Sequence, residues 1–164
     1  MQLAPVQQNE EERLEALHKM ALLDTVPEGR FDHLTKEAIE KLHVPISTIT
    51  LVDKDREWFK SKQGLENKEG KRSTSFCGHA LFATDMFVVE DTLKDDRFKD
   101  NPMVIGSPYI RFYAGISLRD HKTHLPVGVF CVKDIKPKKL TLDEINIFMD
   151  LASKAEIELN RSQS

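Results

Sequence analysis

The sequence predicts an α+β fold built around an antiparallel sheet of five to six strands. Two observations carry this prediction. Apolar residues recur at helical spacing near both ends of the chain, whereas the middle alternates between apolar and polar positions in runs rich in β-branched residues. The 164 residues match one ordinary domain, which we place at residues 9–160, between a flexible leader at residues 1–8 and a short tail at residues 161–164.

The composition excludes several classes of protein. With 24 basic and 27 acidic residues the net charge is −3, so no broad nucleic-acid surface is expected. No apolar run approaches the roughly 18 residues of a membrane span, and the first residues lack the basic start and apolar core of a signal peptide. Two cysteines are too few for a disulfide framework. We therefore expect a cytoplasmic protein with no nucleic-acid partner and no membrane insertion.

Two helices are predicted before the sheet. Asn9 precedes three glutamates, which is typical of a helix start, and the following apolar spacing places the first helix at about residues 10–22. The second helix carries an apolar stripe that begins at Phe31 and ends at Leu42. The proline at position 45 ends the helical pattern, because the residue before a proline disfavours helical geometry.

Period-two alternation and β-branched residues predict the strands at residues 46–53, 57–63, 87–91, 111–119 and 126–133. Residues 64–71 are expected to form a charged loop and residues 75–84 a short helix. The segment 92–110 is dense in Asp, Pro and Gly and is predicted to be a long loop. Loops of this length in a compact domain usually carry function.

A long helix is predicted at the end of the chain. Thr141 and Glu144 have the spacing of a capping box, and a regular apolar face follows them. Ile147 and Leu151 widen that face. They either contact a partner helix or broaden one contact within the molecule.

Four blocks of sequence follow one another at spacings that fit these strands and loops. They are RSTSFCGHA at residues 72–80, VEDTLKDDRFKDNPMV at 89–104, YIRFYAG at 109–115 and VGVFCVKD at 127–134. Together they resemble the GAF domain, in the form found at the N-terminal sensory end of bacterial diguanylate cyclases and histidine kinases. The resemblance implies that the N- and C-terminal helices cover one face of the sheet, and that a short helix and a long loop cover the other.

A ligand pocket is expected where the short helix, the 92–110 loop and the last three predicted strands enclose a space over the sheet. The candidate ligand-binding residues are Phe76, Cys77, His79, Asp91, Arg97, Phe98, Asn101, Arg111, Phe112, Tyr113 and Cys131. The two arginines suit an anion, although neighbouring aspartates can neutralise them. The sequence leaves the identity of the ligand open.

These candidate residues also fit purely structural roles. The charged ones alternate in sign and can form a buried network that ties the long loop to the sheet. That network would comprise Asp91, Arg97, Asp100 and Arg111. Phe112 and Tyr113 point to opposite faces of their strand, so at most one of them lines a pocket. The glycines at positions 115 and 128 are expected to allow close approach of neighbouring atoms.

No catalytic residues are predicted. Cys77 and His79 do not face each other on a regular helix, so Cys77 is expected to be a buried structural residue. One GAF branch reduces free methionine sulfoxide with clustered cysteines, whereas Cys77 and Cys131 are far apart in the sequence. The two can still meet across the fold, so a cysteine-dependent redox enzyme is kept as the less favoured alternative.

No motif for a metal, a nucleotide or a covalent bilin is found. His121 and His124 lack further ligands at useful spacing. The stretch from Gly64 to Lys71 departs from a phosphate-binding loop in its glycine interval, and the cyclic-nucleotide signature of the family is only half present. Neither cysteine has the neighbouring histidine that often accompanies bilin attachment. Haem ligation by His79 stays open, and the cofactor is unknown.

Three functions are therefore considered. The first is a non-catalytic regulatory sensor domain that binds a small molecule and forms a homodimer through its terminal helices. It would control an output module, either in the same chain or in a separate partner. The second is a pure dimerisation or protein-interaction module with a vestigial pocket. The third is the cysteine-dependent enzyme. By its fold alone the resemblance favours the first two.

Overall fold

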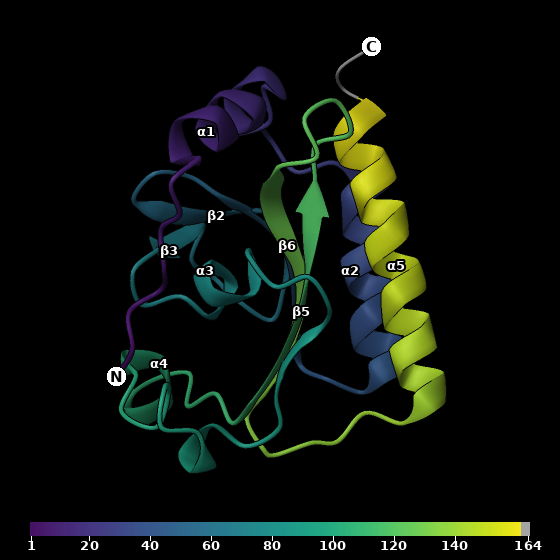
Figure 1. Cartoon of the computed structure of the whole chain (residues 1–164). Coiled ribbons are helices and arrows are strands. Elements are labelled where there is room, and N and C mark those ends of the chain that lie inside the picture. Colours follow the sequence, from purple (N-terminus) through teal and green to yellow (C-terminus); the bar gives the residue numbers. More distant parts are fainter. Residues whose placement is uncertain (162–164) are drawn as a thin grey trace.

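One antiparallel sheet of six strands organises residues 1–161, which the computed structural model describes (Figure 1). Its strand order is β3-β2-β1-β6-β5-β4. The strands are β1 Ile46–Val52, β2 Arg56–Gln63, β3 Glu69–Lys71, β4 Phe87–Val89, β5 Phe112–Arg119 and β6 Pro126–Asp134. This arrangement confirms the predicted α+β class. β3 lies inside residues 64–71, where only a loop is predicted, and becomes the sixth strand.

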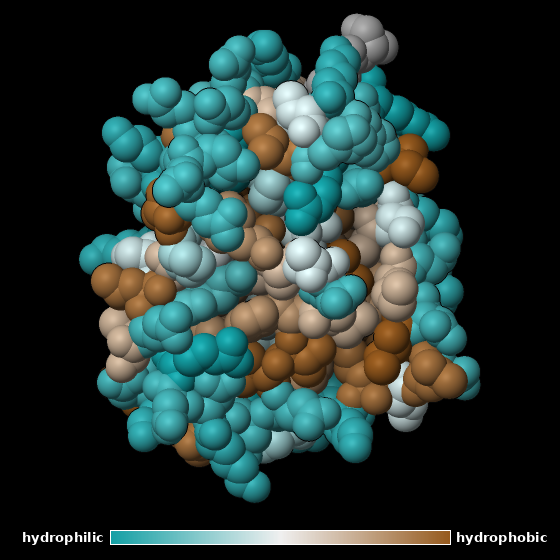
Figure 2. All heavy atoms as spheres, viewed as in Figure 1, coloured by the Kyte–Doolittle hydropathy of each residue, from teal (hydrophilic) through white to brown (hydrophobic). Residues whose placement is uncertain are grey.

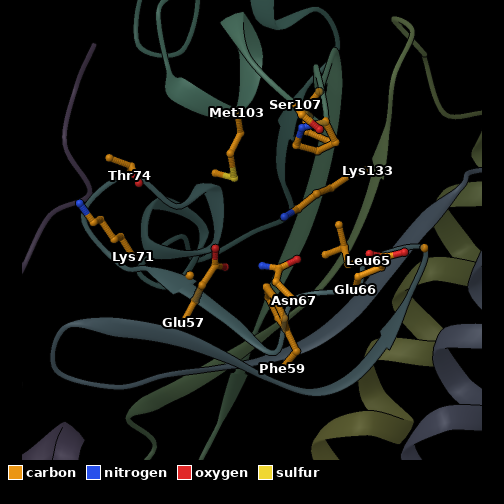
Figure 3. Close-up of a pocket in the computed structure, with 14 residues that line it drawn as sticks. Glu57, Phe59, Leu65, Glu66, Asn67, Lys71, Thr74, Met103, Ser107 and Lys133 are labelled. Atoms are coloured by element: carbon orange, nitrogen blue, oxygen red, sulfur yellow. The ribbon is translucent and has the colours of Figure 1, made fainter.

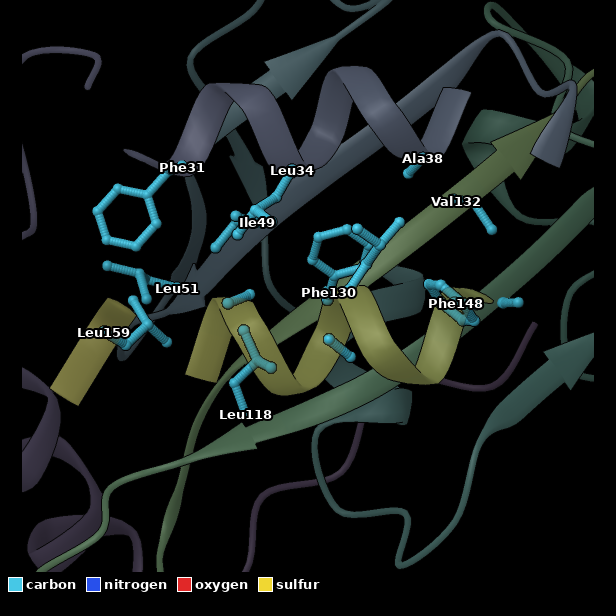
Figure 4. Close-up of a cluster of buried hydrophobic side chains, with 14 of the residues drawn as sticks. Phe31, Leu34, Ala38, Ile49, Leu51, Leu118, Phe130, Val132, Phe148 and Leu159 are labelled. Carbon is cyan, nitrogen blue, oxygen red and sulfur yellow. The ribbon is translucent and has the colours of Figure 1, made fainter. Parts of the chain in front are cut away.

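Two helices, α2 (Gly29–Leu42) and α5 (Leu142–Arg161), lie side by side on one face of the sheet (Figure 1). Figure 4 shows the main core between these helices and the strands, with Phe31, Phe130 and Phe148 among its largest side chains. Thr141 and Glu144 make the two reciprocal bonds of the predicted capping box, at 2.9 and 3.1 Å. Leu151 is buried in this core and Ile147 packs against it, so the wide face of α5 serves a contact within the molecule.

α1 (Glu10–Lys19) lies at one end of the sheet, and its buried residues Ala16 and Leu17 join the same core (Figure 1). The helix is shorter than predicted, because Ala21 adopts a left-handed conformation with φ of 55°. Asn9 occupies the N-cap position but makes no capping hydrogen bond with its side chain. Before the helix, Gln2 and Ala4 donate backbone hydrogen bonds to the carbonyl oxygens of Arg97 and Ser73, so the leader has defined partners.

The opposite face of the sheet carries short elements. They are α3 (Phe76–Ala80), the 3₁₀ turn η1 (Thr92–Lys94) and α4 (Pro102–Ile105). The last two lie within the predicted 92–110 loop, and α3 is shorter than the predicted helix at residues 75–84. The Ser75 side chain starts α3 by accepting a 2.9 Å hydrogen bond from the Gly78 amide. A second buried cluster, around Phe76, Phe98 and Tyr113, fills the space between these elements and the sheet.

α5 ends at Arg161, and the remaining tail residues, 162–164, lie outside the described part of the chain. Across residues 1–161, no helix combines the length and the apolar character that a membrane crossing requires.

Candidate functional site

A cavity of about 610 Å³ opens on the α3 face of the sheet (Figure 3). It lies between strands β2 and β3 on one side and the segment 103–110 on the other, with Lys133 of β6 also in its wall. Its polar side chains are Glu57, Glu66, Asn67, Lys71, Thr74, Ser107 and Lys133. Its apolar side chains are Phe59, Leu65, Met103, Pro108 and Ile110. This volume and mixed lining are typical of small-molecule sites.

Glu57 places a carboxylate in this cavity without a matching partner. It lies in β2 opposite Gly70 of β3, and its side chain points into the cavity (Figure 3). Only 2% of the residue is exposed, and its Oε1 atom has no hydrogen-bond partner. Burial raises the pKa of this carboxyl, and the positive charge of Lys133 and a hydrogen bond with Cys77 oppose the shift only in part. A buried carboxylate of this kind is costly unless a donor reaches it.

Lys133 brings the opposite charge to the same cavity. It follows Cys131 by two positions on β6, so strand alternation turns its side chain toward the α3 face. The residue is 2% exposed, and within residues 1–161 it forms no ion pair and no side-chain hydrogen bond. Its Nζ atom lies 5.9 Å from the centroid of the Tyr113 ring, which is a weak cation–π contact. Burial lowers its pKa, but the nearby groups Cys131 and Glu57 outweigh burial and raise it. The lysine is therefore an ammonium ion at neutral pH.

The gap between the two charges is the main feature of the site. No nitrogen of Lys133 lies within 4.0 Å of an oxygen of Glu57, although each changes the pKa of the other. Figure 3 shows both side chains extending into the open space from different strands. The Gly70 position helps to keep this space open, because a Cβ there would lie 3.3 Å from Glu57 Oε2.

A buried cluster of sulfur and hydroxyl groups lies on the same face of the sheet. The Tyr113 hydroxyl donates to Cys77 Sγ at 3.2 Å, and Thr48 Oγ1 lies 2.9 Å from Cys131 Sγ. Burial and the neighbouring Cys131 raise the pKa of the Cys77 thiol. Burial also raises the pKa of Cys131, but the hydrogen bond with Cys77, the charge of Lys133 and the hydrogen bond with Thr48 lower it to about 7. The two cysteines, distant in the sequence, thus meet in the fold, and Cys77 is buried as predicted.

The space that the sequence assigns to the pocket is filled by aromatic rings. Phe76 stacks on Phe98 at 4.5 Å and on Tyr113 at 5.2 Å between ring centroids. His79 packs edge-on against Phe98 at 4.8 Å, and its Nε2 atom lies 3.2 Å from the Gln2 carbonyl oxygen. Ligand binding by the candidate residues thus stays a prediction, and in the structure their rings contact one another. The cavity lies beside this aromatic cluster, toward β2 and β3, because the rings pack against one another.

The charged candidates do not form the predicted network. Each instead holds its own part of the 92–110 segment. Asp91 accepts from the Leu93 amide, Arg97 pairs with Asp95, and Arg111 donates to the Val104 carbonyl oxygen. Asp100 pairs with the N-terminal amine. The predicted tie between these four residues and the sheet is thus replaced by separate contacts, three of them within residues 91–111 and one with the N-terminus. They satisfy polar groups of the loop without burying ion pairs.

Asn101 and Phe112 have clear structural positions. The Asn101 side chain accepts from the Met103 amide and donates to the Thr74 carbonyl oxygen at 2.9 Å, which links α4 to the cavity wall. Phe112 lies in the main core on the opposite face of the sheet from Tyr113, as the alternation predicts. None of the eleven candidate residues lies in the wall of the cavity.

Glu57 and Lys133 were not among the predicted site residues, although the strand pattern indicates that both side chains point inward. Lys133 and Cys131 lie two positions apart on a strand whose other residues are mostly apolar, so their side chains point to the same face of the sheet. This pattern predicts an inward-pointing lysine. Glu57 shares its face with Phe59 in the same way. Within residues 1–161, no group of three or more His, Cys, Asp and Glu side chains is arranged to hold a metal ion, and His121 pairs with Glu156.

Comparison with known proteins agrees with the α+β fold described above. The family model described as GAF domain matches residues 27–159. A cyclic di-GMP phosphodiesterase of Pseudomonas aeruginosa is 34% identical over 138 residues, which represent 84% of this chain and 23% of that protein. The chain therefore spans about a quarter of the length of this relative.

Solved structures with the same fold come from proteins of different activities. The GAF domain of a phosphoenolpyruvate-protein phosphotransferase from Acinetobacter has a TM-score of 0.63 at 15% identity, covering 92% of this chain and 94% of that one. A type II free methionine-R-sulfoxide reductase from Thermoplasma acidophilum has a TM-score of 0.65 at 10% identity, covering 80% and 91%. The PixJ GAF domain of Thermosynechococcus elongatus has a TM-score of 0.61 at 15% identity, covering 96% and 90%. At such identities the likeness concerns the fold alone.

Proposed function

The chain belongs to the GAF domain family, whose members are generally sensory and regulatory domains, and from this we propose that it is a non-catalytic sensor domain. The ligand is a small molecule that occupies the cavity between β2, β3 and the segment 103–110. The observation that carries the proposal is the buried Glu57 carboxylate in the wall of an open cavity, whose Oε1 atom has no hydrogen-bond partner. Such a group is costly to the empty domain, and a bound ligand offsets that cost.

The output of the sensor is proposed to lie in another module of the same chain or in a separate partner. The cyclic di-GMP phosphodiesterase relative supports an output that acts on cyclic di-GMP, because the matching segment is about a quarter of that protein. Within this domain, a ligand that contacts Glu57 and Lys133 touches strands whose other face packs against α2 and α5. A small shift of the sheet is thereby passed to α5.

Native mass spectrometry of the full chain, after incubation with a bacterial metabolite extract, tests this function. We expect the folded protein to retain a bound molecule whose mass is smaller than that of a short peptide. The denatured control should lack this extra mass. Thr74→Trp fills the cavity wall and should abolish the extra mass, whereas Leu93→Trp, at an exposed position of η1 outside the cavity wall, should retain it. A chain that stays empty in the extract contradicts the sensor proposal.

A second candidate, a pure dimerisation module, is favoured by one observation. The aromatic cluster of Phe76, Phe98 and Tyr113 fills the space beneath the long loop, as a vestigial pocket would require. Exposed apolar residues on α5, namely Leu142, Met149 and Ile157, offer the contact. An empty protein that is dimeric in the same mass spectra would favour this function over the sensor.

A cysteine-dependent redox reaction fits the site less well. Cys77 and Cys131 meet, and the pKa of Cys131 is lowered to about 7. Both thiols are nevertheless fully buried beside packed strands, and burial raises the pKa of Cys77. A redox-active cysteine is normally accessible and ionised. We propose that the cysteines are structural, so Cys77→Ser should leave ligand retention in the native mass spectra intact.

A further inference from the structure

We propose that the ligand of this cavity is a small zwitterion of the free amino-acid class, with its ammonium group against Glu57 and its carboxylate against Lys133. The inference rests on the proposed function, because it names the chemical class of the molecule in the same cavity. It is carried by the separation of two opposite buried charges that share one open space (Figure 3).

Neither buried charge forms an ion pair with a protein group in the described part of the chain. Glu57 Oε1 has no hydrogen-bond partner, and Lys133 forms no ion pair within residues 1–161. Two buried opposite charges gain most by pairing directly, yet these two are held on β2 and β6, with β1 between their strands. One molecule that carries both a cation and an anion satisfies both groups at once. A ligand of a single charge would leave one of them without a partner.

The charges of the cavity wall are balanced. The ionisable side chains are two carboxylates, Glu57 and Glu66, and two ammonium groups, Lys71 and Lys133. A polyanion such as a nucleotide would bring its phosphates close to the carboxylates, and a simple amine would face the lysines. A molecule with no net charge but with two charged ends fits this wall best.

Part of the cavity wall is apolar. Phe59, Leu65, Met103 and Ile110 form a hydrophobic surface beside the charged pair. Small-molecule sites use such surface for the body of the ligand and a few polar groups for its orientation. An amino acid with an apolar side chain has both parts. This selects apolar amino acids over short polar zwitterions.

The electrostatics agree with this orientation. Burial raises the pKa of Glu57, so an ammonium group beside it favours the ionised carboxylate and repays part of its desolvation. The other charged or titratable neighbours of Glu57 are Cys77 and Lys133. Cys77 lowers the pKa of Glu57 by a hydrogen bond but carries no positive charge, and Lys133 forms no ion pair with Glu57.

Thermal denaturation of the full chain with each of the twenty free L-amino acids at millimolar concentration tests the proposal. We expect one or more apolar amino acids to raise the Tm. The N-acetyl derivative of the same amino acid lacks the cation and its primary amide lacks the anion, and each should bind roughly 10- to 100-fold more weakly. Equal binding of the free and the N-acetylated form would overturn the proposal.

Variants assign the two ends of the ligand. Glu57→Gln should weaken amino-acid binding by a similar factor while leaving the Tm of the empty protein unchanged or higher, because it removes an unpartnered buried charge. Lys133→Met should weaken the same binding. Glu90→Gln and Lys136→Met are matched exchanges at exposed positions and should bind normally. A Glu57→Gln protein that binds the amino acid as well as the natural chain does would contradict the assignment.

The two proposals fail in different ways. If no amino acid raises the Tm while a small molecule from the metabolite extract is retained, the zwitterion proposal is wrong and the sensor proposal stands. If plain carboxylates bind as tightly as amino acids, the same conclusion follows. If neither the amino acids nor the extract gives binding, both proposals are wrong.

Discussion

At the scale of single residues, the central strands have positions with no room for one more carbon. Gly128 of β6 lies against β1, where an added Cβ would overlap the Thr50 carbonyl oxygen. That oxygen belongs to the backbone of a neighbouring strand, so it cannot move aside as a side-chain end would. Gly115 of β5 is similar, since a Cβ there would overlap the Tyr113 hydroxyl. The close approach predicted for both glycines is therefore confirmed.

We expect Gly128→Ala to lower the free energy of unfolding by about 1–3 kcal/mol, the usual cost of overpacking. Urea denaturation followed by tryptophan fluorescence measures it through Trp58, which is buried in the main core. Gly29→Ala is the control, because nothing lies within 4 Å of an added Cβ at the start of α2. That control should be neutral or stabilising by up to about 1 kcal/mol. Equal stabilities of the two variants would show that the strands are not closely packed at Gly128.

The candidate residues show what a sequence reveals at this scale and what it does not. The opposite orientation of Phe112 and Tyr113 follows from the period of a strand and is confirmed. The role of Glu57 depends instead on what surrounds its carboxylate, and a carboxylate without a partner is a property of the whole fold. The opposite charges of Asp91 and Arg97 predict an ion pair when only the sequence is considered. In the fold, a nearer backbone amide or Asp95 satisfies each of them first.

At the scale of elements, α1 is attached to the domain by an ion-pair cluster. Glu10 accepts hydrogen bonds from both Arg13 and Arg72, and the arginines are almost fully buried. Arg72 comes from the segment before α3, so the cluster joins the first helix to the face that carries the cavity. Burial raises the pKa of Glu10, but the hydrogen bonds from Arg13 and Arg72 outweigh it and hold the pKa below its usual 4.5.

The lowered pKa of Glu10 predicts how the stability of the protein changes with pH. A carboxylate with a lowered folded-state pKa stabilises the protein above its ordinary pKa, and the contribution is lost as the pH falls through the folded value. Glu10→Gln should therefore cost about 1–2 kcal/mol at pH 7, and the difference from the natural chain should shrink below pH 4.5. Chemical denaturation at a series of pH values measures this difference.

Glu11→Gln is the matched control for Glu10→Gln. It removes the same charge from the first turn of α1, where acidic residues favour the helix dipole, but Glu11 is exposed. Its effect should stay within about 0.5 kcal/mol. If both exchanges cost the same at every pH, the contacts with Arg13 and Arg72 do not stabilise the docked helix.

The elements differ in how far the sequence predicts them, for physical reasons. The capping box at Thr141 and Glu144 is local, so its two hydrogen bonds form as predicted. β3 was not predicted, because Glu69, Gly70 and Lys71 show no hydrophobic pattern and pair only as an edge strand of β2. The end of α1 was misplaced because Ala21 has an alanine's helical preference but takes a left-handed conformation in the tertiary fold.

At the scale of the whole molecule, the two faces of the sheet have different roles. The α2 and α5 face is a continuous core, whereas the other face combines a packed aromatic cluster with the open cavity (Figures 1 and 4). The surface also carries apolar residues that the core does not use. Figure 2 shows hydrophobic atoms gathered beside the first turns of α5, where Met86, Val88 and Ile145 line a groove. Leu142, Met149 and Ile157 of α5 are 73%, 53% and 49% exposed.

These exposed residues locate the proposed homodimer contact on α5 rather than α1, whose outward side chains are mostly acidic. Leu142, Met149 and Ile157 recur at intervals of seven and eight residues, which places them along one stripe of the helix. In a twofold dimer each residue contributes twice. Replacing two of them with lysine should therefore weaken the dimer at least tenfold. Analytical ultracentrifugation over a range of concentrations measures this change.

The double variant Met149→Lys with Ile157→Lys needs a control that adds the same positive charge away from the stripe. Asp96→Lys does so, because its side chain is 93% exposed and lies between η1 and α4. We expect the control to dimerise as the natural chain does, and both proteins to keep the natural Tm, since none of these side chains belongs to the core. A natural chain that is monomeric at tens of micromolar would remove the homodimer from the proposal. A double variant that dimerises normally would move the contact to another surface, and ligand signals could then not reach a partner chain through the stripe on α5.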